Sequence, residues 1–106
     1  MTSVASKPGA GRYTEDEARA LIEHYEHLRE LEGTRPRGIE WLARRSDLDR
    51  ALELISDEYW EVVLLAGLIG FTTYETARLL RISQTAVTKR YRYAIEEVAY
   101  HMTEGT

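Results

Sequence analysis

Apolar residues in the last third of the chain recur at steps of three and four, the spacing that places them on one side of a helix. From Gln84 onward, this stripe consists of Val87, Tyr91, Ala94, Ile95 and Val98. Ser83 stands immediately before it and offers a hydroxyl that can cap the first turn. The pattern predicts a helix that begins at Gln84 and buries one face, followed by a tail after Val98 that frays.

A shorter helix is predicted just upstream of this one. Thr72 or Thr73 can cap it, and its apolar side is formed by Ala77, Leu79 and Leu80. A break at Arg81 and Ile82 separates the two helices. Two short helices with a small residue where they cross are typical of a helix-turn-helix.

The face opposite the apolar stripe carries polar groups that can contact base edges: Gln84, Thr85, Thr88, Lys89 and Arg92. Phosphate contacts are predicted from the start of the shorter helix and from nearby cations, namely Thr72, Thr73, Arg78, Arg81 and Arg90. Positions 78 to 92 contain no acidic residue. Double-stranded DNA is therefore the predicted partner, and the alternative is a helical hairpin whose basic face is merely solvated.

The N-terminal part of the chain predicts a disordered tail over 1–12, a helix over 13–32 and a linker over 33–38. Thr14 and Glu17 form a capping-box pattern at the start of this helix. Its narrow apolar stripe consists of Ala18, Leu21, Ile22, Tyr25, Leu28 and Leu31. The stripe packs on the rest of the chain or, alternatively, pairs with a second copy in a homodimer through the 14–31 helix.

The middle of the chain predicts further helices. Ser46 is a candidate N-cap that makes 39–45 and 47–55 separate or kinked segments, and Ser56 caps the next helix. The stretch 59–69 is apolar nearly all round, which indicates a central core helix buried on several sides and ended by Gly70. The fold class is therefore all-α, a helical bundle whose C-terminal domain spans 39–102 and is followed by a disordered tail at 103–106.

Residues 47–102 resemble the C-terminal DNA-binding domain of bacterial sigma factors, their region 4. The matching positions, in order along four helices, are Leu48, Ala51, Leu52, Gly70, Glu75, Ala77, Leu80, Ile82, Ser83, Val87, Arg90 and Ala94. Three positions depart from the family pattern. Thr76 replaces an aliphatic residue, Arg81 a glycine and Tyr93 a second arginine. The resemblance places a residue with positive φ at Arg81, which is uncommon for a side chain other than glycine.

The resemblance implies a small sigma region 4-like transcriptional regulator of bacterial or phage origin, acting alone, as a dimer or with RNA polymerase. One alternative is a protein-interaction module that binds RNA polymerase or another transcription factor through the same scaffold. Another is a phage DNA-packaging component. Residues 51–71 carry four acidic groups and no basic ones, and the net charge of the chain is −4. This acidity favours a protein partner, whereas the basic 78–92 segment favours DNA.

Composition excludes several other classes. The chain has no cysteine, which excludes disulfides and thiolate metal sites. It has no glycine-rich phosphate loop and no catalytic cluster, so we expect neither an enzyme nor a cofactor. His24 and His27 have a spacing that could hold a metal, but nothing completes a ligand set. No apolar run approaches membrane-spanning length, and the expected location is the cytoplasm.

Overall fold

The computed structural model describes residues 13–25 and 39–104, and every regular element within these ranges is a helix. The predicted all-α class is therefore confirmed. The helices are α1 (Glu15–Glu23), α3 (Ile39–Leu54), α4 (Asp57–Val62), the π-helix η2 (Val63–Ile69), α5 (Thr73–Leu80) and α6 (Gln84–Glu104). The predictions for the 1–12 tail, the end of the first helix and the 33–38 linker lie outside the described residues.

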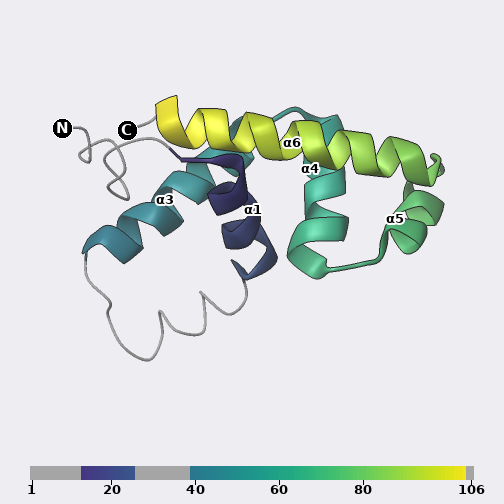
Figure 1. Cartoon of the computed structure of the whole chain (residues 1–106), viewed down its shortest axis with the longest axis horizontal. Coiled ribbons are helices and arrows are strands. Elements are labelled where there is room, and N and C mark those ends of the chain that lie inside the picture. The colour runs from purple at the N-terminus through teal and green to yellow at the C-terminus, as the bar shows by residue number, and fades with distance from the viewer. Residues whose placement is uncertain (1–12, 26–38, 105–106) are drawn as a thin grey trace.

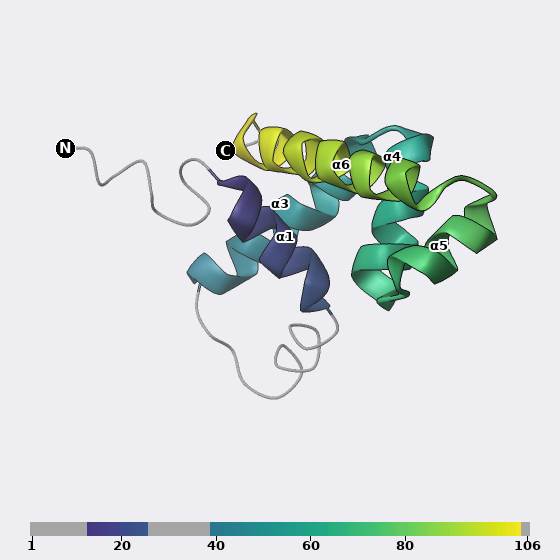
Figure 2. The same ribbon diagram turned by 45° about the vertical axis from the view of Figure 1, so that its right-hand side comes forward.

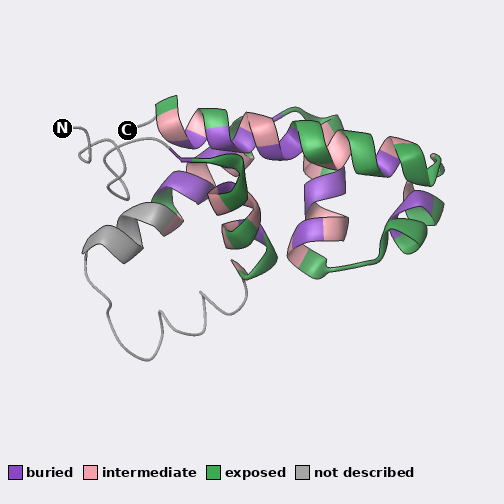
Figure 3. Ribbon diagram, viewed as in Figure 1, coloured by how far each residue is buried: buried purple, intermediate pink, exposed green. Residues whose placement is uncertain are grey.

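The long helix α6 organises the fold. Figures 1 and 2 show it running along one side of the molecule, with α5 near its N-terminal end and α1 and α3 near its C-terminal end. The predicted stripe is confirmed, because Val87, Ala94, Ile95 and Val98 are buried and Tyr91 is half-buried. Figure 3 shows this burial alternating with exposed positions along the same helix.

The predicted frayed tail after Val98 is wrong. Helix α6 continues to Glu104, and both Ala99 and Met102 are buried in the core. The backbone N–H of Tyr13 also donates to the Thr103 hydroxyl oxygen at 2.9 Å. This hydrogen bond to a residue far away in the sequence holds the last turn of α6. The local sequence contains no signal that predicts it.

The predicted break at Ser46 is also wrong, because α3 is one continuous helix. Ser46 lies exposed in its middle, where water can satisfy the hydroxyl. The Arg45–Asp49 ion pair spans the position of the expected break, and the Arg50–Asp47 pair forms in the turn that follows it. Burial of the apolar stripe, which includes Leu48 and Ala51, favours a continuous helix more strongly than the capping signal favours a break.

Helix α1 begins as predicted, with a complete capping box between Thr14 and Glu17. Its stripe packs within the chain, since Ala18 and Ile22 are fully buried and α1 lies against α6, η2 and α3. The helix is interrupted within the predicted range. His24 leaves the helical conformation with φ −113° and ψ 22°, so the expected uninterrupted helix through Leu31 is broken there.

The predicted central core helix is divided into α4 and the π-helix η2. Ser56 occupies the N-cap position but its hydroxyl makes no capping bond, whereas Gly70 ends η2 as expected with φ 96°. The segment packs on several sides, because Val62 and Val63 are buried in two different hydrophobic clusters and the segment contacts α1, α5 and α6. It is not buried all round, since Leu64 and Leu65 are half-buried and Ile69 is 56% exposed. So small a domain cannot surround every apolar helix.

Among the residues whose burial the structure describes, the buried apolar ones form two hydrophobic clusters. The larger joins α1, α3, η2 and the C-terminal half of α6. The smaller consists of Val62, Ala77 and Val87, which hold α4, α5 and the start of α6 together. Tyr91 packs against both clusters. The α5–α6 pair therefore has its own small core and is tied to the main one through α6.

Candidate functional site

The start of α5 is fixed by a capping box. Thr72 is the N-cap: its hydroxyl accepts from the Glu75 N–H at 3.0 Å, and its own N–H donates to the Glu75 carboxylate at 2.9 Å. Of the two candidate caps, the structure thus selects Thr72 and makes Thr73 the first helical residue. The N–H of Thr73 has no acceptor within the helix, as is general for a first turn, and its residue is exposed.

The inner face of α5 differs from the prediction at one position. Ala77 is buried against Val87, as expected for a close helix crossing. Leu79 is 57% exposed, because it lies two residues and thus about 200° around the helix from Ala77. Thr76 occupies the buried position instead, and its hydroxyl oxygen has no hydrogen-bond partner among the described residues.

The turn between the helices has the expected geometry. Arg81 adopts the left-handed conformation with φ 61° and ψ 43°. The N–H groups of Arg81 and Ile82 both donate to the Ala77 carbonyl, which closes the end of α5. Ser83 then accepts from the Ala86 N–H at 3.0 Å and caps α6 as predicted.

All five predicted base-reading residues lie together on the exposed side of α6. With Thr73 from the start of α5, they line a shallow hollow of about 470 Å³, whose α6 members are Gln84, Thr85, Thr88, Lys89 and Arg92. Each of these side chains is exposed. The helix phase deduced from the buried stripe therefore places this set on one continuous surface, which we call the reading face.

The predicted phosphate-binding cations separate into two groups. Arg81 is exposed at the turn, and Arg78 lies exposed over the ring of Tyr74. Arg90 instead turns toward α4, where its Nε lies 3.3 Å from a carboxylate oxygen of Glu58. Its charge is thus compensated within the protein, a pairing across 32 residues that helix periodicity does not reveal. Arg92 keeps only an exposed contact of 3.8 Å with Glu96, the kind of pair that contributes little stability.

Two residues of α1 beside the reading face, Arg19 and Glu23, had not been identified as site residues from the sequence, and both contact Tyr91. The Tyr91 hydroxyl donates to a carboxylate oxygen of Glu23 at 2.9 Å, and the Arg19 guanidinium lies 5.3 Å from the centroid of the Tyr91 ring. Burial, reinforced by the Glu23 carboxylate, raises the pKa of Tyr91. Arg19 and Glu23 lie on the polar side of α1, so only the tertiary packing could reveal them.

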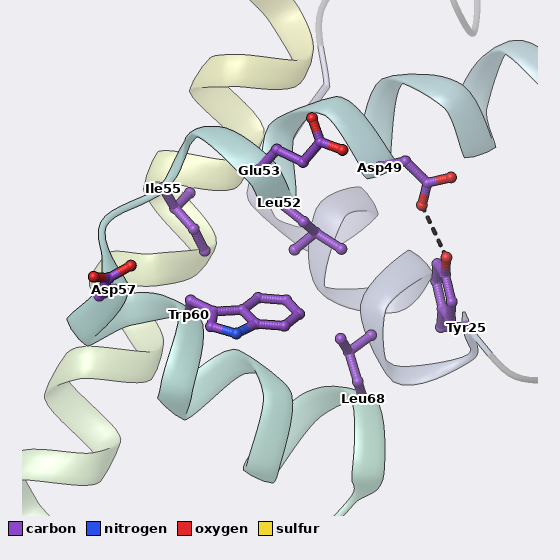
Figure 4. A pocket seen from close by; sticks show the side chains of 8 residues that line it. All are labelled: Tyr25, Asp49, Leu52, Glu53, Ile55, Asp57, Trp60 and Leu68. Carbon is purple, nitrogen blue, oxygen red and sulfur yellow. Dashed lines mark hydrogen bonds between the residues drawn. The ribbon is translucent and has the colours of Figure 1, made fainter.

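A second surface feature lies away from the reading face, between Tyr25, which follows α1, and the helices α3, α4 and η2 (Figure 4). This groove, of about 570 Å³, has an apolar part formed by Leu52, Ile55, Trp60 and Leu68. Carboxylates of Asp49, Glu53 and Asp57 also line it, and the Tyr25 hydroxyl donates to Asp49 at 2.9 Å. Mainly through burial, the pKa of Tyr25 is raised. We call this feature the acidic groove.

Within residues 13–25 and 39–104, no group of three or more potential metal ligands occurs. His27, the second member of the candidate histidine pair, lies outside the described residues. None of the helices in these ranges is long and apolar enough to span a membrane.

No family model, curated protein or solved structure matches this chain. The resemblance to sigma region 4 thus rests on the sequence positions given above.

Proposed function

We propose that this protein is a sequence-specific, double-stranded DNA-binding transcriptional regulator that inserts the N-terminal half of α6 into the major groove. The observation that carries the proposal is the reading face. Its five side chains, all exposed and all hydrogen-bonding types, project from one helix whose opposite face is held by Val87, Ala94 and Ile95. A rigid helix with a solvated polar face is the form in which helix-turn-helix proteins read base edges.

The dimensions of α6 support this docking. Gln84 and Arg92 are eight residues apart, which corresponds to about 12 Å along a helix, close to the width of the major groove. Gln84, Thr85, Thr88 and Lys89 would then lie over base edges, while Arg92 would reach the groove rim. Thr73 at the start of α5, with Arg78 and Arg81, would contact the phosphate backbone.

The acidic groove favours a second candidate function, the binding of a protein partner such as a subunit of RNA polymerase. It combines exposed apolar surface around Trp60 with the carboxylates of Glu53 and Asp57. A partner that presents both apolar and basic side chains would complement it. This groove and the reading face involve different residues, so the two functions are compatible.

The test of the DNA-binding proposal begins with selection from a random duplex library. Lys89→Ala is then compared with wild type on the selected duplex and on a scrambled one. We expect the variant to lose about 1–3 kcal/mol of discrimination between them, the value of one good base contact. Arg50→Gln removes the same charge from α3, on a different part of the molecule (Figure 1), while keeping a donor for Asp47, and serves as the control. Equal losses by Lys89→Ala on both duplexes would contradict base reading by this residue.

A further inference from the structure

Helix α1 is coupled directly to the reading half of α6 through Tyr91. One face of the Tyr91 ring is covered by the Arg19 guanidinium, and its hydroxyl is held by Glu23, both from α1. Tyr91 also packs against both hydrophobic clusters. The position of Arg19 relative to α6 is therefore fixed by packing, by a hydrogen bond and by a cation–π contact.

Arg19 borders a second hollow beside the reading face. This hollow, of about 470 Å³, shares Thr73, Thr88 and Arg92 with the first and adds Arg19 and Tyr91. The two hollows are thus neighbouring parts of one surface, and guanidinium groups from α1 and α6 both line the second. Arg19 makes no ion pair with a carboxylate among the described residues, so its charge is open to an external anion.

We propose that Arg19 binds a DNA backbone phosphate at the rim of the major groove, which makes α1 a third DNA-contacting element beside α5 and α6. The proposal rests on the proposed function. Arg92, which lines the second hollow together with Arg19, is about 12 Å along α6 from Gln84. With α6 in the groove, Arg92 and the adjacent Arg19 would lie toward the rim, where phosphates bound a groove about 12 Å wide. A guanidinium is well suited to a phosphate because it can donate two parallel hydrogen bonds.

The stacking of Arg19 on Tyr91 prepares it for this contact. A free arginine side chain loses rotamer freedom when it binds, whereas one already held over a ring loses less. Glu23 weakens phosphate binding by Arg19, because its carboxylate lies at the hydroxyl end of the Tyr91 ring and repels a phosphate. The contact between Arg19 and a phosphate should consequently help to fix the register of the protein on the duplex, but it should not distinguish one base from another.

The experiment measures the affinity of wild type, Arg19→Ala, Glu23→Gln and Lys89→Ala for the selected duplex and a scrambled one across a salt series. For Arg19→Ala we expect roughly ten- to hundredfold weaker binding to both duplexes, the effect of one charged hydrogen bond. For this variant, the plot of log affinity against log salt should be shallower by about 0.9 in slope, because one fewer phosphate is neutralised. Glu23→Gln keeps an acceptor for Tyr91 and should retain the wild-type slope with equal or tighter binding.

The outcomes separate this inference from the proposed function. An unchanged salt slope for Arg19→Ala, alongside weakened specific binding by Lys89→Ala, overturns the Arg19 contact alone. Loss of affinity at an unchanged slope also overturns it, because Arg19 would then only support α1. Absence of DNA binding by the folded wild type overturns both proposals. A parallel titration with inorganic phosphate tests whether Arg19 binds a free anion instead of DNA. If phosphate binding depends on Arg19 while the salt slope for DNA does not, the result counts against the DNA contact.

Discussion

Thr76 is a buried residue whose side chain does not suit its surroundings. It is fully buried in α5, and its hydroxyl oxygen has no partner among the described residues. Leaving such a group unsatisfied costs about 1–3 kcal/mol, and valine has nearly the same shape without the hydroxyl. We predict that Thr76→Val raises the free energy of unfolding by roughly 1 kcal/mol, measured by urea denaturation. Destabilisation would indicate that the hydroxyl has a partner that holds α5 in place.

Arg81 combines a strained backbone with an exposed charge. Its left-handed conformation costs a non-glycine residue about 1–2 kcal/mol, partly offset by the greater freedom of glycine in the unfolded chain. Arg81→Gly should therefore stabilise the fold by roughly 0.5–1 kcal/mol. If Arg81 contacts phosphate, the same variant binds all duplexes more weakly and with a lower salt slope. Denaturation and DNA titration of one protein test the two opposite effects.

At the residue scale, most helix caps were predictable from local sequence, with Ser46 and Ser56 as exceptions, and long-range partners were not. The caps at Thr14, Thr72 and Ser83 depend on atoms within three residues, and each forms as the sequence indicates. The compensation of Arg90 by Glu58 depends on how α4 packs against α6. No periodicity within α6 contains that information, so Arg90 could only be predicted as a surface cation.

The π-helix η2 brings its backbone close to α1 at Gly67. A Cβ added there would lie 2.6 Å from Cγ2 of Ile22 and 3.1 Å from the Tyr91 hydroxyl oxygen. Ile22 is fully buried and branched at Cβ, so it cannot move aside easily. We predict that Gly67→Ala destabilises the protein by roughly 1–3 kcal/mol despite the higher helix propensity of alanine.

A double-mutant cycle tests whether this close approach is the cause. Ile22→Ala removes the atom that the new methyl group would meet. In that background, Gly67→Ala should cost much less than it does in wild type. Equal costs in both backgrounds would show that the effect arises at Tyr91 or within η2 and not at Ile22.

At the element scale, the amphipathic helices were predicted better than the uniformly apolar one. The apolar stripe of α6 shows which side of the helix is buried. It thereby also predicts the reading face, which lies on the opposite, exposed side. The segment 59–69 has no such asymmetry, so its sequence revealed neither the π-helix nor which leucines lie half-exposed. In α3, long-range burial of Leu48 and Ala51 prevailed over the local capping signal of Ser46.

At the scale of the whole molecule, charge is distributed by region. The net charge is −4, yet 78–92 contains no acidic residue and the acidic groove lies on other elements. Such separation allows a protein that is acidic overall to present a surface suited to phosphates. The charge segments were visible in the sequence. The association of Arg19 with the α6 surface was not, because it depends on how α1 packs against Tyr91.

The measurement that tests the central claim most directly is the affinity for duplex DNA between about 50 and 200 mM salt, for wild type and Lys89→Ala/Arg92→Ala. Both side chains are exposed on the reading face, so the double variant should fold normally, as circular dichroism can verify. The account predicts a steep salt dependence for wild type, and weaker binding with a shallower slope for the variant. Failure of the folded wild type to bind duplex DNA even at low salt would contradict it.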